Sequence, residues 1–288
     1  MTALIQNRYL STSLLVVFYL DRLYRLQPKY LFYLILTTVY FFVVGTDGYL
    51  LKTINLESMI MNIMIVPTNF YILDFMAGKG IIPQAWSLGL EACFYLLIPF
   101  MFMFIFKMRW VAVGLSFFTF GLAYFAFIPT DWFGYRLIPG TLYIFLLGSF
   151  MYAPGKFGKA LVVTFFLVSV SFAILTIGFG FKQLPYNAEV LIGIIIGIPA
   201  IYALANLKLG KLDDMLGNIS YGVFLNHFLF IWLFTKLGIV LSTYGAFFSL
   251  LSLSILLAWA TFKFIEKPCL NLRRNLRIKA DAKALALS

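Results

Sequence analysis

The chain has 288 residues, of which 62% are hydrophobic and only 11% are charged, and its mean hydropathy is +0.96. This composition excludes a soluble globular protein and is typical of a polytopic membrane protein. The net charge of +11 does not indicate a nucleic-acid partner, because the basic residues fall in short clusters between apolar runs, where such residues anchor cytoplasmic loops.

Long apolar runs predict an all-α polytopic transmembrane helical bundle of about eight spans, because one span needs about 20 apolar residues. No stretch is polar enough to form a second, soluble domain, so we interpret residues 1–288 as a single integral membrane domain. The predicted spans are residues 29–45, 86–106, 110–128, 136–152, 160–180, 188–206, 217–235 and 242–263.

The stretch between the first two spans, residues 47–85, does not fit this pattern. Its apolar run from Met59 to Leu73 is broken by Pro67 and Asn69. Because one more span here would invert every later loop, we expect a re-entrant or interfacial segment on the outer side of the membrane.

Basic residues recur at every second boundary between spans. Since basic clusters mark cytoplasmic loops, this pattern predicts that both termini are cytoplasmic. The clusters are Arg22, Arg25 and Lys29; Lys107 and Arg109; Lys156 and Lys159; Lys208 and Lys211; and Lys267, Arg273, Arg274, Arg277 and Lys279.

Four short stretches carry distinctive motifs. They are FYLDRLYRLQP at 18–28, WSLGLEACFYLLIP at 86–99, LGNISYGVFLNH at 216–227 and FIEKP at 264–268. In this order, each at a helix end, they resemble the motifs of the membrane-bound acyltransferase-3 family, whose members O-acylate sugars of bacterial surface polysaccharides. The resemblance covers almost the whole chain. Asp21 departs from it, because the family often has the first of two adjacent arginines there.

The resemblance implies an enzyme of the bacterial inner membrane that transfers an acyl group, most often acetyl. The donor would be cytoplasmic acyl-CoA, a co-substrate and not a bound cofactor, and the acceptor a hydroxyl of an envelope saccharide or lipid-linked glycan. Family members usually begin with two further spans, which carry an arginine and the histidine thought to act in acyl transfer. This chain is N-terminally short by comparison, so it is a truncated product, a sequence whose true start lies upstream, or a divergent member.

Two alternatives to an enzyme stay open. One is an inactive fragment that retains only the binding cavity. The other is a transporter or flippase-like protein for lipid-linked glycans, although only the segment around Pro67 has the interrupted character of transporter helices.

Two titratable residues inside apolar runs are the candidate catalytic residues. Glu91 is an acid in a predicted span, where charge is costly and usually functional, and it shares a helix face with Ser87 and with one aromatic residue, Phe94 or Tyr95. His227 is the only histidine, and its imidazole would either accept a proton from a sugar hydroxyl or hydrogen-bond a neighbouring helix. The face shared by Ser220, Phe224 and His227 is the predicted interior of its helix.

Arg22 and Arg25 are the candidate donor-binding residues, because guanidinium groups bind phosphate oxygens bidentately; otherwise they only anchor the topology. Glu266 is predicted to form a helix-end ion pair, and the glycines at 193 and 197 a close helix contact. No metal-ligand cluster is present in the sequence. The remaining motif residues that we assign to substrate binding are Trp86, Ser87, Tyr95, Ser220 and Tyr221.

Overall fold

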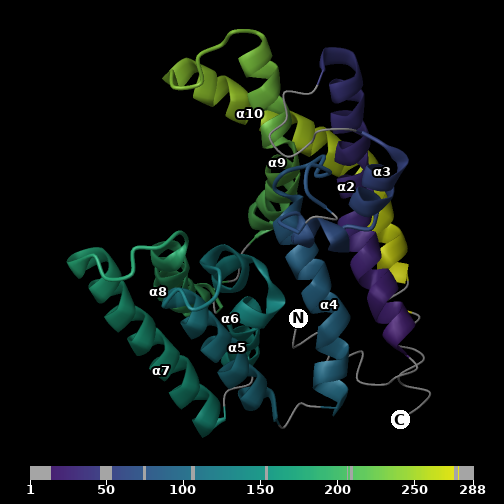
Figure 1. The fold of residues 1–288 in the computed structure, drawn as a ribbon. Coiled ribbons are helices and arrows are strands. Elements are labelled where there is room, and N and C mark those ends of the chain that lie inside the picture. Colours follow the sequence, from purple (N-terminus) through teal and green to yellow (C-terminus); the bar gives the residue numbers. More distant parts are fainter. Residues whose placement is uncertain are drawn as a thin grey trace. The chain divides into compact units, whose positions relative to one another are not determined.

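The computed structural model describes residues 14–45, 54–73, 76–104, 108–152, 155–205, 207, 210–275 and 278. Its regular elements are all helical in this part of the chain, so the all-α prediction is confirmed (Figure 1). Helices are expected here, because in lipid each backbone group must find its hydrogen-bond partner within the protein. The chain forms two compact units: unit 1 contains residues 93–208, and unit 2 combines residues 13–92 with 209–288.

Unit 2 is built around three long helices, and α10 packs along α9 while α2 contacts α9 and η6. Its elements are α2 (Leu15–Val44), α3 (Leu56–Ile63), the 3-10 helix η2 (Val66–Phe70), the first turns of α4 (Ala85–Phe104), α9 (Lys211–Lys236), α10 (Tyr244–Thr261) and the π-helix η6 (Phe262–Glu266).

A glycine lets α9 and α10 approach closely. A Cβ atom at Gly222 would lie 2.6 Å from the Cβ of Ala258, so only glycine fits there. Next to this contact, the buried Asn226 amide donates a hydrogen bond of 3.0 Å to the Ser254 carbonyl. Small residues and interhelical hydrogen bonds of this kind hold helices together in lipid.

The segment between α2 and α4 is held by Asn62, which is fully buried. Its backbone carbonyl accepts from the Tyr30 hydroxyl at 2.9 Å, and its side chain donates to the Lys79 carbonyl at 2.7 Å and accepts from the Ile81 amide at 3.1 Å. Within residues 54–73 and 76–84 no helix is long enough to span a bilayer, as predicted. Asp47, at the start of the predicted segment, lies outside the described residues, and the outer location stays a prediction.

Unit 1 is a row of helices in which α5 packs on α6, α6 on α7 and α7 on α8. Their bounds are α5 (Arg109–Tyr124), α6 (Ile138–Tyr152), α7 (Lys156–Ala173) and α8 (Asn187–Leu204), with the π-helices η4 (Asp131–Arg136) and η5 (Ile174–Gly178). The predicted close contact at Gly193 and Gly197 is wrong, because a Cβ at either position would meet no described atom within 4 Å.

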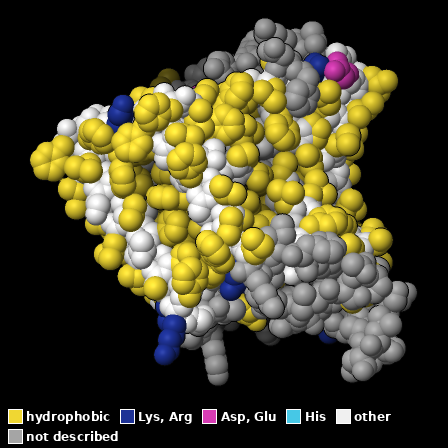
Figure 2. Space-filling view, turned by 60° about the horizontal axis from the view of Figure 1, so that its bottom comes forward, with side chains coloured by type: hydrophobic (Ala, Val, Ile, Leu, Met, Phe, Trp, Pro, Cys, Tyr) yellow, Lys and Arg dark blue, Asp and Glu magenta, His cyan; other side chains and the backbone are white. Residues whose placement is uncertain are grey.

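Six helices are long and apolar enough to cross a membrane, which supports an integral membrane protein. They lie at Leu15–Val44, Ala85–Phe102, Lys156–Gly178, Asn187–Leu204, Leu212–Lys236 and Tyr244–Asn275. The predicted count of eight is not confirmed, because α5 and α6 have only 16 and 15 residues. A helix of 15 residues is about 22 Å long, shorter than a hydrocarbon core of about 30 Å. Figure 2 shows one face of the molecule, on which hydrophobic side chains predominate.

The helix that contains the first predicted span begins well before residue 29, and the start of the span within it stays a prediction. Helix α2 begins at Leu15 and runs through Pro28, so the basic residues at 22, 25 and 29 lie within the helix. The hydropathy pattern treats these charges as the end of a span, whereas Arg22 and Lys29 are buried in ion pairs. Of the predicted cytoplasmic clusters, Lys107, Lys208, Arg277 and Lys279 lie outside the described residues, as does the side chain of Lys211.

Candidate functional site

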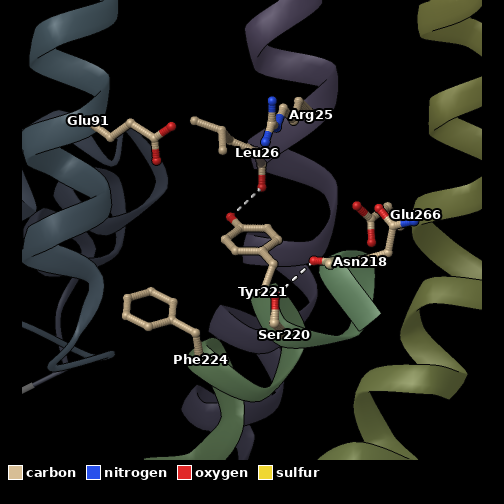
Figure 3. Close-up of a pocket in the computed structure, with 9 residues that line it drawn as sticks. Arg25, Leu26, Glu91, Asn218, Ser220, Tyr221, Phe224 and Glu266 are labelled. Carbon is tan, nitrogen blue, oxygen red and sulfur yellow. Dashed lines mark hydrogen bonds between the residues drawn. The ribbon is translucent and has the colours of Figure 1, made fainter. Parts of the chain in front are cut away.

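Unit 2 contains a pocket with a volume of about 460 Å³ (Figure 3). Segments far apart in the sequence contribute to it: α2, α4, α9 and η6. The lining residues are Arg25, Leu26, Glu91, Gly217, Asn218, Ser220, Tyr221, Phe224 and Glu266. Residues from all four sequence motifs therefore meet at one place.

The pocket brings together Arg25 and Glu91, two of the predicted site residues. Arg25 is exposed on α2, and Glu91 lies in the second turn of α4 with its carboxylate directed toward the α2 side of the pocket (Figure 3). A guanidinium and a carboxylate on one cavity offer a site for an anion and an acceptor for a proton.

The α9 wall of the pocket carries two hydroxyl groups. The Tyr221 hydroxyl donates a hydrogen bond of 3.1 Å to the Leu26 carbonyl (Figure 3). The Ser220 hydroxyl donates one of 2.9 Å to the Gly217 carbonyl. Because both protons are engaged with backbone carbonyls, the oxygens of these hydroxyls are available as hydrogen-bond acceptors for a ligand.

Behind this wall, Lys29 forms an ion pair with Glu266. The lysine side chain is fully buried, and its ammonium also donates a hydrogen bond of 2.7 Å to the Asn218 carbonyl and lies 5.4 Å from the centre of the Tyr221 ring. One cation therefore holds three residues that line the pocket. The ion pair predicted for Glu266 is present. The sequence analysis does not predict that Glu266 lines the pocket, although the motif at 264–268 marks this segment as distinctive.

Arg22 is not brought to the pocket, although the sequence grouped it with Arg25. Its Nε donates a hydrogen bond of 3.1 Å to Asp21, which is fully buried and also accepts from Arg273 at 2.9 Å. The acidic residue at position 21 explains the difference, because the Asp21 carboxylate binds the Arg22 guanidinium and also pairs with Arg273.

Trp86, Ser87 and Tyr95 do not line the pocket either. The Trp86 ring lies 6.5 Å from the ring of Tyr71, and the Ser87 hydroxyl donates to the Gln84 carbonyl at 3.1 Å. Tyr95 belongs to unit 1, where its ring lies 6.4 Å from that of Phe94.

His227 lies on α9 but is not among the residues that line the pocket. Its Nδ1 is 3.1 Å from the Val223 carbonyl, and its ring lies 4.8 Å from that of Phe228. The predicted interior face of this helix is wrong, since Ser220 is exposed. The buried positions of this helix are Ile219, Gly222, Leu225, Asn226, Leu229 and Phe234. Ser220 and Phe224 face the pocket instead.

Comparison with known proteins gives a family match over most of the chain. The acyltransferase-3 family, described as an acyltransferase domain, matches residues 5–263. An uncharacterized protein of Aquifex aeolicus is 31% identical over 202 residues, which cover 68% of this chain and 90% of that protein. No solved structure matches the chain.

Proposed function

The chain belongs to the acyltransferase-3 family, and on this premise we propose that it is an O-acyltransferase that uses cytoplasmic acyl-CoA. The acyl group is most simply acetyl, and the acceptor is a hydroxyl of an envelope saccharide or lipid-linked glycan. The membrane is the bacterial inner membrane, with both termini in the cytoplasm, where the donor exists. The observation that carries the proposal is the meeting of Arg25 and Glu91 with the hydroxyl-bearing wall of α9 on one pocket.

Arg25 binds the donor in this proposal. Its guanidinium is exposed on the pocket, and a guanidinium forms two parallel hydrogen bonds to phosphate oxygens such as those of coenzyme A. Arg22 takes a different role, because its charge is already engaged by Asp21. It neutralises Asp21, the residue that joins α2 to Arg273 through a second ion pair.

Glu91 assists the transfer step. Its carboxylate accepts the proton of the acceptor hydroxyl as the hydroxyl oxygen attacks the thioester carbonyl carbon. The carbon–sulfur bond then breaks, an ester forms, and coenzyme A leaves as a thiolate that takes up a proton. The oxygens of Ser220 and Tyr221 accept hydrogen bonds from other hydroxyls of the sugar and orient it.

The test is acyl transfer in a bacterial host that lacks its own enzyme for the saccharide. Membranes containing the chain receive radiolabelled acetyl-CoA, and label in the saccharide is measured. We expect Glu91→Gln to lower the rate of acyl transfer at least about 100-fold, the low end of general-base contributions. His227→Gln should retain most of the wild-type rate. Equal amounts of correctly inserted protein are the control.

Three outcomes would contradict the proposal. Full activity of Glu91→Gln would remove the carboxylate from the reaction. Loss of activity in His227→Gln alone would show that the imidazole of His227, and not Glu91, is the general base. An inserted wild-type chain that binds glycan but transfers no label would favour the non-enzymatic alternative.

A further inference from the structure

A second cavity lies in unit 1, in a groove between α7 and α8, and its volume is about 460 Å³. From α7, Lys159, Val162, Val163 and Phe166 line it, at the spacing of one helix face, and Ile198, Pro199 and Tyr202 of α8 line its other side. None of these residues belongs to the four motifs or to the pocket of unit 2.

The groove is apolar along its length and polar at one end only. Lys159 lies in the first turn of α7, and Tyr202 lies two residues before the end of α8, so both belong to the end of the helix pair opposite its connection. Val163 and Phe166 continue the groove along α7 toward the middle of the helix. In a membrane-spanning pair the helix ends lie near the headgroups, where tyrosine and lysine side chains are favoured.

The charge at this end is positive, and within the described residues neither Lys156 nor Lys159 forms an ion pair. Helix α7 begins with Lys156 and Lys159, has no acidic residue in its first turn, and its N-cap residue Gly155 supplies no side-chain cap. The positive end of the helix dipole adds to these two charges. An anion is therefore attracted to the same end that opens into the apolar groove.

The dimensions fit part of one hydrocarbon chain. From Lys159 to Phe166 the groove follows α7 for about 10 Å, which is about two thirds of the roughly 15 Å of hydrocarbon in one leaflet. The volume of about 460 Å³ is ample for that length of chain. A free anion would leave this apolar volume empty, and a neutral lipid would leave the lysine without a partner.

We propose that this groove binds an anionic phospholipid of the surrounding bilayer. The lipid phosphate lies against the Lys159 ammonium and the Tyr202 hydroxyl, and one acyl chain follows the groove past Val163 and Phe166. Basic pockets between transmembrane helices are suited to anionic headgroups. The bound lipid fills the space between α7 and α8 and joins the two helices.

The test uses the purified full chain in detergent, titrated with phosphatidylglycerol or with phosphatidylcholine carrying the same acyl chains. Native mass spectrometry measures the fraction of protein that retains lipid. We expect phosphatidylglycerol to be retained in preference to phosphatidylcholine, and Lys159→Gln to weaken its binding about fivefold, the equivalent of about 1 kcal/mol for one basic residue near a lipid headgroup.

Two further variants separate the groove from general surface charge. Lys156→Gln removes a charge in the same turn from a residue that does not line the groove, and we expect a clearly smaller loss of retention than in Lys159→Gln. Val163→Trp fills the groove while keeping Lys159, and we expect retention to fall at least fivefold in protein that still elutes as a folded species. Equal retention of both lipids, equal effects of the two lysine variants, or full retention in Val163→Trp would each overturn the proposal.

Discussion

Lys29 of α2 and Glu266 of η6 form an ion pair in which the lysine side chain is fully buried and the glutamate nearly so. The pair joins α2 to η6 beside the candidate pocket. Buried ion pairs contribute little net stability, because desolvation offsets their attraction, but removing one partner leaves a charge with no compensation.

This asymmetry gives a prediction for single and double variants. We expect Lys29→Met or Glu266→Met alone to lower the free energy of unfolding by about 3 to 5 kcal/mol. The double variant should be more stable than either single one, because no buried charge is left. Thermal unfolding of the three variants in one detergent measures this. A double variant as unstable as the two single effects added together would show that the residues do not act as a pair.

Substitutions of the two arginines of the first motif, Arg22 and Arg25, should have different effects on acyl-CoA affinity and on stability. We expect Arg25→Ala to weaken acyl-CoA binding by about 1.5 to 3 kcal/mol, the range for hydrogen bonds to charged groups, with little change in stability. Arg25→Lys should restore little of this binding, because lysine lacks the planar fork. Arg22→Ala should instead lower stability and leave acyl-CoA affinity nearly unchanged. Calorimetric titration and thermal unfolding distinguish the two, and the opposite assignment would contradict the geometry.

The sequence predicted the helical class, the motif-bearing segments and the interruption between residues 47 and 85, because hydropathy and proline placement report on these directly. It did not predict that α2 begins at Leu15, since charges inside an apolar helix look like the end of a span unless their partners are known. Those partners, Asp21 with Arg273 and Lys29 with Glu266, come from opposite ends of the chain.

The candidate site was predictable in part. Helical spacing grouped Arg22 with Arg25 and His227 with Ser220, but spacing along one helix does not show which neighbour faces each side chain. The structure places Arg25, Glu91, Ser220 and Tyr221 on the pocket, whereas His227 is absent from its lining.

The contact between α9 and α10 predicts opposite effects at two glycines. We expect Gly222→Ala to cost about 1 to 3 kcal/mol of stability, because the new methyl group overlaps Ala258 and forces the helices apart. Gly193→Ala is the matched control within α8, where a Cβ meets open space, and it should be neutral or slightly stabilising. Melting temperatures in one detergent measure both. Equal effects at the two glycines would show that the close approach does not matter.

The proposed topology predicts which side of the membrane two lysine positions face. Lys156 begins α7, and Lys182 follows η5, which continues α7 without a break. In a background without Cys93 and Cys269, a cysteine in place of Lys182 should react with an impermeant maleimide on intact cells. A cysteine in place of Lys156 should react only after permeabilisation, because basic loops remain in the cytoplasm. The reverse pattern would invert the arrangement of unit 1 in the membrane.

The central claim is that acyl-CoA binds at the pocket formed by Arg25, Glu91 and the α9 wall, and photocrosslinking tests it most directly. A coenzyme A thioester with a diazirine at its acyl end is irradiated with the purified chain, and the labelled peptides are identified by mass spectrometry. We predict labelling within residues 85–92 and 217–224 that excess acetyl-CoA suppresses and Arg25→Ala reduces. Labelling confined to α5–α8 and insensitive to Arg25→Ala would contradict the account.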